Sequence, residues 1–543
     1  MKKKCIAFVL LLCMLCSSFM TACGGTTTKT PENALEAMQQ VNVQELNVIE
    51  DNYRNVYEIF PYSFCDSDGD GIGDIQGIIS KLDYIKELGI NSIWLTPVHQ
   101  STTYHKYDVI DYYSIDAQFG TVEDYEQLLE EAHNRDMTVL MDLVVNHTSS
   151  SHPWFFEAKQ YIKSLAPGQQ PSAEECPYVD YYVFSNEYKS GFTKIEGTEW
   201  YYESQFWSGM PDLNLDSEAV RNEIDQIVQF WLDKGVDGFR LDAVTSYYTG
   251  NDTKNIEFLT WLNDCVKEKK ADAYIVGECW TNSVTYTNYY ASGVDSFFNF
   301  DFATNVGTIA NALNSGSGAD KFGEKIVLVD EMMAANNPNY IGAAFTSNHD
   351  NGRAAGVLPG DANKLKMAQA MAMMMGGSYY LYYGDEVGMK GSGDDENKRA
   401  PMQWSTDSTA DGMCKSVATR VIEMTHGSVE TQAEDPDSLL NYVKQGLLLR
   451  NMYPEIARGT NEVITECSST DVLVLKKNYE GSELLIVMNI SANANTVDLS
   501  SVSINGKEVG DFEVAGTLLV SAEMVTVEEA TLQMPAYAIE ILK

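Results

Sequence analysis

The sequence predicts an α/β protein built on a parallel (β/α)8 barrel, and three observations lead to this prediction. Short apolar runs alternate with amphipathic helical stretches from residue 56 onward, and their number approaches eight βα units. Residues 138–145 are apolar at most positions, which is typical of a strand buried on both faces. Residues 75–88 carry Ile and Leu at helical spacing, as expected for a helix that covers a sheet.

The expected elements follow one another in the order strand, helix, strand. Strands are expected over residues 56–64, 91–97, 138–145, 236–244, 273–279, 296–302, 342–347 and 378–383. Helices are expected over residues 75–88, 122–135, 218–233 and 254–269. The catalytic barrel is therefore expected over residues 51–432.

Two segments depart from this alternation. About seventy residues rich in Tyr, Ser, Pro and Gly separate the strand that ends near His147 from the helix that begins at Glu218, and so long a loop is uncommon unless it is functional. We expect a small inserted domain at about residues 148–211. After about residue 432 separate strand-like runs replace the alternation, which predicts a C-terminal antiparallel β-domain over residues 433–543.

The N-terminus has the pattern of a bacterial lipoprotein signal. Lys2, Lys3 and Lys4 precede an apolar run over residues 6–15 that is too short to span a bilayer. The run Met20-Thr21-Ala22-Cys23 resembles a lipobox, although Leu is commoner than Met at its first position. We expect a signal peptide over residues 1–22, a diacylglycerol on Cys23, a tether over residues 23–50 and attachment to the outer side of a bacterial membrane. The alternative is an ordinary signal peptide with an incidental cysteine.

The composition narrows the class of partner. The chain has 37 Lys and Arg against 78 Asp and Glu, a net charge of −41, and this balance disfavours nucleic acid because phosphate binding relies on basic residues. A neutral polymer such as a glycan is compatible with it. The six cysteines that follow Cys23 are scattered and form no CxxC pair, so we expect no metal cluster and no disulfide framework.

Polar residues gather where the predicted strands end, which is where barrel enzymes carry their chemistry. They are Asp142, Asn146, His147, Arg240, Asp242, Glu278, His349 and Asp350. A carboxylate on an apolar strand is costly unless it is paired or used, and here several strands contribute one. Retaining glycosidases need a nucleophilic carboxylate close to a protonated one, and Asp242 and Glu278 would supply such a pair. Spacing alone leaves open which of the two has which role.

These motifs resemble those of the α-amylase family of glycoside hydrolases. The matching stretches are residues 142–147 (DLVVNH), 238–242 (GFRLD), 277–278 (GE) and 348–350 (NHD), in the order and spacing of that family. The resemblance implies a (β/α)8 TIM barrel with an inserted B domain and a C-terminal antiparallel β-sandwich domain. It also implies an α-glucan substrate such as starch or maltooligosaccharides.

The resemblance assigns roles by position. Asp242 corresponds to the nucleophile, Glu278 to the general acid and base, and Asp350 to the residue that binds sugar hydroxyls and stabilises the transition state. Arg240 would hydrogen-bond Asp242 and keep it ionised. The other expected substrate contacts are His105, Tyr107, His147, His349 and Arg353.

An acidic loop predicts a calcium site. Residues 66–74 (DSDGDGIGD) place hard oxygen ligands at alternate positions, with glycines that permit a tight turn and without the terminal Glu of an EF-hand. The expected ligands are Asp66, Asp68, Asp70, the Ile72 carbonyl and Asp74, and the loop resembles that of oligoglucosidase-like members. A second, interdomain calcium is not expected, because Thr245 and Ser246 stand where many members carry Lys and His.

Two motifs point to different members of the family. Residues 210–214 (MPDLN) resemble a group intermediate between neopullulanases and oligo-1,6-glucosidases, and residues 399–404 (RAPMQW) resemble oligoglucosidases and trehalose synthases. Because an exported enzyme usefully cuts polymers too large to import, we expect an endo-acting α-amylase. The near alternatives are an α-glucosidase, an oligo-1,6-glucosidase or a cyclomaltodextrinase. Intact catalytic motifs argue against a non-catalytic glycan-binding surface protein, and the barrel motifs argue against a solute-binding lipoprotein.

Overall fold

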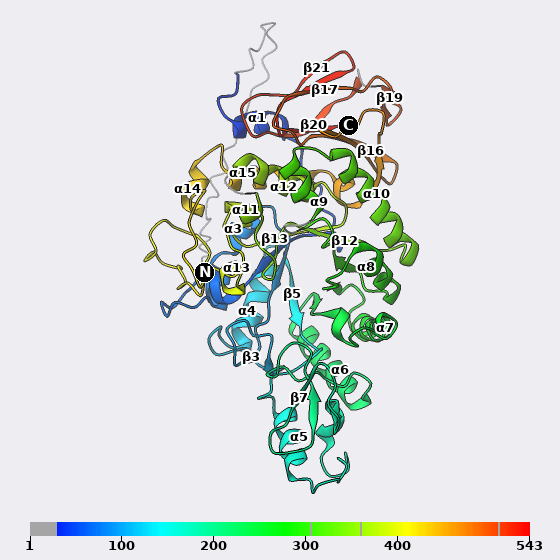
Figure 1. Ribbon diagram of the computed structural model, residues 1–543. Coiled ribbons are helices and arrows are strands. Elements are labelled where there is room, and N and C mark those ends of the chain that lie inside the picture. The colour runs from blue at the N-terminus through cyan, green and yellow to red at the C-terminus, as the bar shows by residue number, and fades with distance from the viewer. Residues whose placement is uncertain (1–29, 304–306, 359–360, 509–510) are drawn as a thin grey trace, which may run out of the picture.

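The computed structural model describes residues 30–303, 307–358, 361–508 and 511–543 (Figure 1). The predicted signal peptide and Cys23 lie outside these residues. In the described part of the chain, no helix is both long enough and apolar enough to cross a membrane.

Eight parallel strands in the described residues close a barrel, which confirms the predicted fold class. Around the barrel they follow the order β1 (Asn55–Ile59), β13 (Ser378–Tyr382), β12 (Ile341–Phe345), β11 (Ser296–Phe298), β10 (Tyr274–Gly277), β9 (Gly238–Leu241), β5 (Thr138–Leu143) and β2 (Ser92–Leu95). Each strand ends earlier than the apolar pattern indicated, because the chain turns there into the loops that carry the site. After β1, for example, Pro61 begins the 3-10 turn η1 (Pro61–Ser63).

Helices surround the barrel and bury their apolar stripes against it. They include α2 (Ile75–Ser80), α3 (Leu82–Glu87), α4 (Val122–His133), α6 (Glu218–Lys234), α7 (Asp252–Lys269), α8 (Ser283–Tyr289), α9 (Thr308–Ser315), α10 (Ala319–Asn336) and α12 (Ala362–Met373). The single helix expected over residues 75–88 is two helices that meet at Lys81. Ile78, Leu82 and Ile85 are nevertheless all buried, so the apolar stripe continues across the break.

The predicted inserted domain follows β5 and forms one end of the molecule (Figure 1). It contains helix α5 (Pro153–Ser164) and a small antiparallel sheet of β6 (Phe184–Ser185), β8 (Tyr201–Glu203) and β7 (Phe192–Lys194). The Phe155 ring packs on Tyr202 with centroids 4.8 Å apart, which gives this domain a core of its own. A backbone bridge between His147 and Asp212 closes the domain beside the barrel.

The C-terminal domain pairs two antiparallel sheets at the other end of the molecule (Figure 1). One sheet has the order β14 (Thr460–Val463), β15 (Val472–Tyr479), β16 (Ser482–Asn489), β23 (Ile539–Leu542) and β20 (Val514–Leu518); the other has β17 (Asn495–Asp498), β22 (Thr531–Met534) and β21 (Thr526–Glu528). Helix α15 (Leu439–Met452) packs on barrel helix α12. The barrel therefore continues past residue 432, where the sequence pattern placed the domain boundary.

Part of the predicted tether is docked on the fold. Within residues 23–50, helix α1 (Ala34–Val41) buries Ala34, Ala37 and Met38 against β20 and α15. The Asn42 side chain, just after α1, donates to the Thr517 carbonyl at 3.0 Å and accepts from the Thr517 N–H at 2.8 Å. The helical spacing of these small apolar residues explains why the segment packs instead of remaining a free linker.

Candidate active site

The guanidinium of Arg240 organises three carboxylates that come from different strands. Nη1 lies 3.0 Å from Oδ1 of Asp142 and 2.7 Å from Oδ1 of Asp242, and Nη2 lies 2.9 Å from Oε2 of Glu278. The same Glu278 oxygen accepts the backbone N–H of Ala243 at 3.0 Å. Because β5 and β9 pair with Asp142 opposite Arg240, the barrel register itself brings these side chains together.

Burial sets the protonation of this cluster. Burial raises the pKa of Glu278 to about 7; Arg240 opposes this shift, and the negative charges of Asp242 and Asp350 add to it. Burial likewise raises the pKa of Asp142 to about 7, again against the attraction of Arg240. A buried carboxyl that holds its proton near neutrality is suited to donate it to a leaving group.

Asp350 has the opposite electrostatic environment. Burial favours its neutral form, but His349 and Arg399 outweigh burial and hold the pKa of Asp350 well below its usual range. Its Oδ2 lies 3.0 Å from Nε2 of His349, and its Oδ1 accepts from Nη2 of Arg399 at 2.6 Å. Asp350 is therefore an anion beside the protonatable Glu278, and the site offers carboxyl groups in two protonation states.

The residues that were predicted to contact sugar lie at different depths around the carboxylate cluster. The Tyr107 hydroxyl lies 2.7 Å from Nε2 of His349 and 3.2 Å from Oδ2 of Asp142. His147 lies 3.2 Å from the Tyr107 carbonyl through Nε2. His105 lies farther out, where its Nδ1 contacts the backbone N–H of Tyr107 at 3.2 Å. The structure thus brings both of these histidines into contact with Tyr107, and Tyr107 joins them to Asp142 and His349.

Arg353 stands apart from the carboxylate cluster. Its Nη1 donates to the Tyr383 carbonyl at 2.7 Å and to Oδ1 of Asp385 at 3.1 Å, and its guanidinium lies 4.1 Å from the Tyr382 ring centroid. The side chain is fully buried among these partners. In this structure Arg353 supports the loop after β13, whereas the sequence placed it among the substrate contacts.

Three residues at the site were not predicted from the sequence. Arg399 belongs to the RAPMQW motif, which indicated a subgroup of related enzymes but no site residue. Glu58 is a carboxylate on an apolar strand, so the criterion that identified Asp242 would have found it. Trp280, two residues after Glu278, is 52% exposed and stacks on Phe300 with ring centroids 5.0 Å apart.

The acidic loop gathers three of its four carboxylates. Asp66, Asp68 and Asp74 each offer an oxygen within 4.8 Å of the others, a donor set that fits a hard divalent cation. Asp70 lies outside this group, and its carboxylate accepts the backbone N–H of Ile72 at 2.7 Å.

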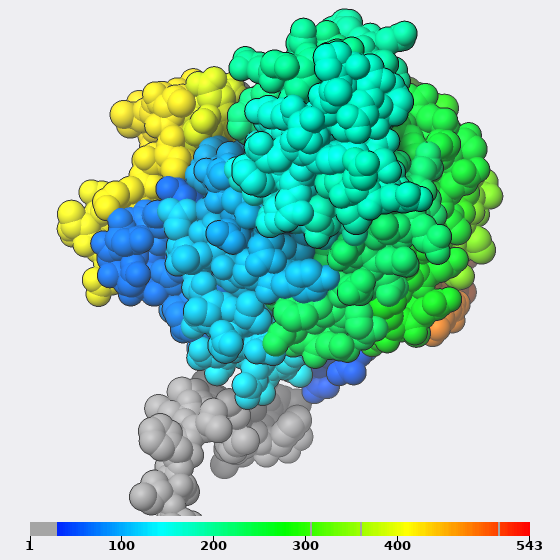
Figure 2. Space-filling model, turned by 90° about the horizontal axis from the view of Figure 1, so that it is seen from below, coloured from blue at the N-terminus to red at the C-terminus, as the bar shows by residue number. Residues whose placement is uncertain are grey.

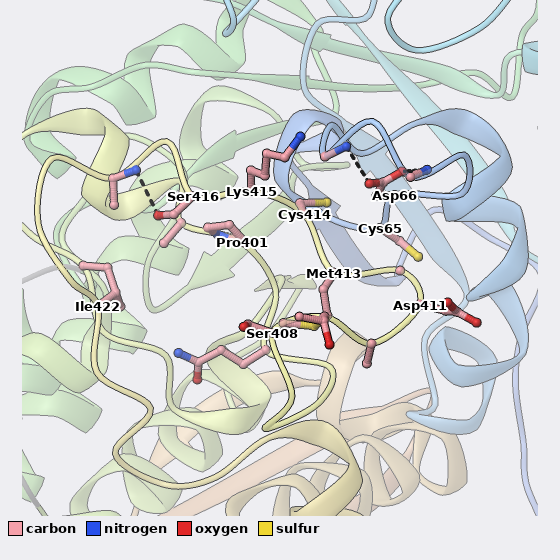
Figure 3. Close-up of a pocket in the computed structure, with 18 of the residues that line it drawn as sticks. Cys65, Asp66, Pro401, Ser408, Asp411, Met413, Cys414, Lys415, Ser416 and Ile422 are labelled. Carbon is pink, nitrogen blue, oxygen red and sulfur yellow. Dashed lines mark hydrogen bonds between the residues drawn. The ribbon is translucent and has the colours of Figure 1, made fainter.

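The segment over residues 400–424 covers this loop. The Asp66 backbone N–H donates to the Gly412 carbonyl at 3.2 Å, and Nζ of Lys415 donates to the Asp70 carbonyl at 2.5 Å. Figure 2 shows this yellow segment beside the blue loop. Between them lies a cavity of about 1370 Å³ that Cys65, Cys414 and Met413 help to line (Figure 3). The described residues that line this cavity include none of the active-site carboxylates Asp142, Asp242, Glu278 and Asp350. The acidic loop and the active site are therefore separate sites.

A closed parallel barrel with paired carboxylates at the ends of its strands is typical of glycoside hydrolases. Residues 58–459 match the family described as "Alpha amylase, catalytic domain", and the chain belongs to the α-amylase family. It is 36% identical over 456 residues to α-amylase 3 of Dictyoglomus thermophilum, covering 83% of this chain and 87% of the other. It is 31% identical to an oligo-1,6-glucosidase of Parageobacillus thermoglucosidasius, covering 80% and 89%. Among solved structures, Eubacterium rectale Amy13B superposes with a TM-score of 0.90 at 48% identity, covering 93% and 98%.

Proposed function

We propose that the protein is an endo-acting, retaining α-amylase that cleaves α-1,4-glucosidic bonds in starch and maltooligosaccharides. The observation that carries this proposal is the Arg240 guanidinium, which holds Asp242 and Glu278 together next to the anionic Asp350. Such an arrangement supplies a nucleophilic carboxylate and a protonated acid that can flank one glycosidic bond.

The reaction then follows two displacements. Asp242 attacks the anomeric carbon while Glu278 gives its proton to the glycosidic oxygen, so the aglycone leaves as an alcohol and a glycosyl ester remains. Glu278, now a carboxylate, takes a proton from water as the water oxygen attacks the same carbon and Asp242 departs. Asp350 binds hydroxyls of the sugar and opposes the positive charge that develops on its ring.

Exposed aromatic rings support action on long chains. Phe206, from the inserted domain, lies 5.4 Å from His147 between ring centroids and is 52% exposed. Trp280 offers an equally exposed ring on the loop after β10. Rings on two different elements would bind sugars beyond the one that is cleaved, which an endo-acting enzyme requires.

Two further proposals concern calcium and location. Asp66, Asp68 and Asp74 would hold one Ca²⁺, which would stabilise the loop after β1 and take no part in the chemistry. The lipobox at Cys23 supports an enzyme anchored by lipid to the outer side of a bacterial membrane.

Product analysis tests the endo mode. With amylose as substrate, we expect the iodine-staining capacity to fall early, while few reducing ends have formed, and maltooligosaccharides of several lengths to accumulate. Proton NMR should detect the α-anomer as the first product. Asp242→Asn should lower kcat by several orders of magnitude while amylose binding persists. Release of glucose alone with slow loss of iodine staining would overturn the endo proposal and leave the hydrolase assignment intact.

An oligosaccharide-directed enzyme is the second candidate. The RAPMQW motif and the 31% identity to the oligo-1,6-glucosidase favour it. Comparison of kcat/KM for maltotetraose and isomaltotriose separates the two, because the α-amylase proposal requires a strong preference for maltotetraose.

A further inference from the structure

We propose that Glu58, on β1, is a positioning residue that holds His349 as an imidazolium against Asp350. The inference rests on the proposed role of Asp350 and deepens the description of the same site. Glu58 contacts the ring of His349, so its effect on the sugar site would pass through that ring.

The contacts of Glu58 are directed at one residue. Oε1 accepts the backbone N–H of His349 at 3.2 Å and lies 2.7 Å from ring Nδ1. Glu58 and His349 are 1% and 0% exposed, so water cannot replace either contact. Nε2, on the other edge of the ring, faces Oδ2 of Asp350 at 3.0 Å and the Tyr107 hydroxyl at 2.7 Å.

This arrangement places one ring between two carboxylates. A neutral imidazole carries a single N–H and can donate to only one of them, whereas an imidazolium donates to both. Two charge-assisted hydrogen bonds then fix the ring in the plane that Asp350 needs. Burial alone lowers the pKa of His349, but Asp350 and Glu58 together raise it to about 9.

Other charged and titratable groups surround the ring on the neighbouring elements. They are Asp142 on β5, Arg240 on β9, Tyr107 on the loop after β2, Arg399 on the loop after β13, and Tyr382 at the end of β13. Arg399 donates to the His349 carbonyl at 3.2 Å and neutralises part of Asp350. Of the carboxylates, Glu58 and Asp350 are the two with an oxygen at the ring nitrogens in the described residues.

The inference predicts a particular effect of Glu58→Gln. The amide keeps an acceptor for both N–H groups and removes the charge, so the pKa of His349 should fall from about 9 to about 6 to 7. The protonated ring is the active form, and a lower pKa means that activity is lost at lower pH. We expect kcat/KM to fall at least about tenfold at pH 8 and less than about threefold at pH 5.5, with a steeper alkaline limb.

The measurement combines a pH profile with histidine NMR. The ring signals of ¹⁵N-histidine-labelled protein are assigned by comparison with His349→Gln, and the pKa of His349 is read in wild type and in Glu58→Gln. Glu386→Gln is the matched control, because Glu386 is equally buried but is held by the hydroxyls of Tyr57 and Tyr84. It should lower the melting temperature without moving the alkaline limb.

The outcomes are distinct. An unchanged His349 pKa and a pH profile of Glu58→Gln that superimposes on wild type would overturn the inference. If Glu58→Gln does not fold, Glu58→Asp keeps the charge, and it should retain a raised His349 pKa with reduced kcat; a normal His349 pKa there would also overturn it. Full activity of Asp350→Asn would instead reject the proposed role of Asp350.

Discussion

Arg399 donates from Nη2 to Oδ1 of Asp350 at 2.6 Å, and this contact joins the long loop after β13 to the loop after β12. The same side chain also donates from Nη1 to the Tyr104 hydroxyl at 2.9 Å. One arginine therefore connects the carboxylate that we assign to sugar binding with the loop after β2.

Arg399→Met should move the acidic limb of activity. Arg399 lowers the pKa of Asp350, whose ionised form is the active one, so activity is present above that pKa and is lost as pH falls through it. Without Arg399 the pKa rises, and the acidic limb of kcat/KM should move to higher pH with a loss of about ten- to a hundredfold at pH 6. Arg420→Met controls for the lost charge, because Arg420 lies on the same loop and its guanidinium hydrogen-bonds Ser392. Matching profiles for the two variants would contradict the role of Arg399.

The alkaline limb of the wild-type profile should report Glu278. Its pKa is raised to about 7 by burial, and its protonated form is needed, so kcat/KM should decline as pH rises through about 7. Glu278→Gln should be nearly inactive on maltotetraose but should still form the glycosyl-enzyme from α-maltosyl fluoride, because fluoride needs no proton to leave. Equal loss on both substrates would argue against Glu278 as the acid.

Calcium removal should affect stability more than chemistry. An ion that binds only the folded state stabilises it by about 2.7 kcal/mol at a hundred times its Kd. Asp68→Ala should abolish the bound calcium and lower Tm, whereas Asp70→Ala should retain most of it, because the Asp70 carboxylate lies outside the group. Metal analysis and thermal melts with and without chelator check this. Metal-free wild-type protein, or an unaffected Asp68 variant, would refute the site.

Lipid attachment at Cys23 should decide where the protein is found. In the native host, Cys23→Ser should move the enzyme from the membrane fraction to the soluble fraction, with unchanged kcat on maltotetraose. Mass spectrometry of the wild-type N-terminus should show a diacylglycerol. A wholly soluble wild type without lipid would refute the anchor.

The fold was largely predictable because a parallel barrel imposes a repeated pattern that each strand shows by itself. Residues 138–145 read as a buried strand from their composition alone. Asp242 and Glu278 were predictable because each motif is local. Contacts between segments that are distant in the sequence could not be predicted. Glu58 and His349 are 291 positions apart, and Arg399 and Tyr104 are 295 positions apart. Only the closed barrel and the path of the long loop bring such pairs together.

Arg353 shows the converse error. Its position, three residues after Asp350, suggested a substrate contact, but side-chain direction is set by the local backbone and by available partners. The Tyr383 carbonyl and Asp385 provide those partners beneath the loop. A buried guanidinium requires such hydrogen bonds, and sequence spacing carries no information about where they are.

The docking of α1 on the C-terminal domain has a consequence for the proposed anchored enzyme. Nine residues lie between Cys23 and Asn33, and covalent geometry limits the ten residue steps to about 35 Å. The bilayer would therefore lie close to the C-terminal sheets, and the inserted domain at the other end of the molecule would extend into the medium (Figure 1). In the proposed anchored enzyme, the carboxylates beside the inserted domain would face a glucan in the medium, and helix α1, with eight residues, would fix the orientation of the active site relative to the membrane.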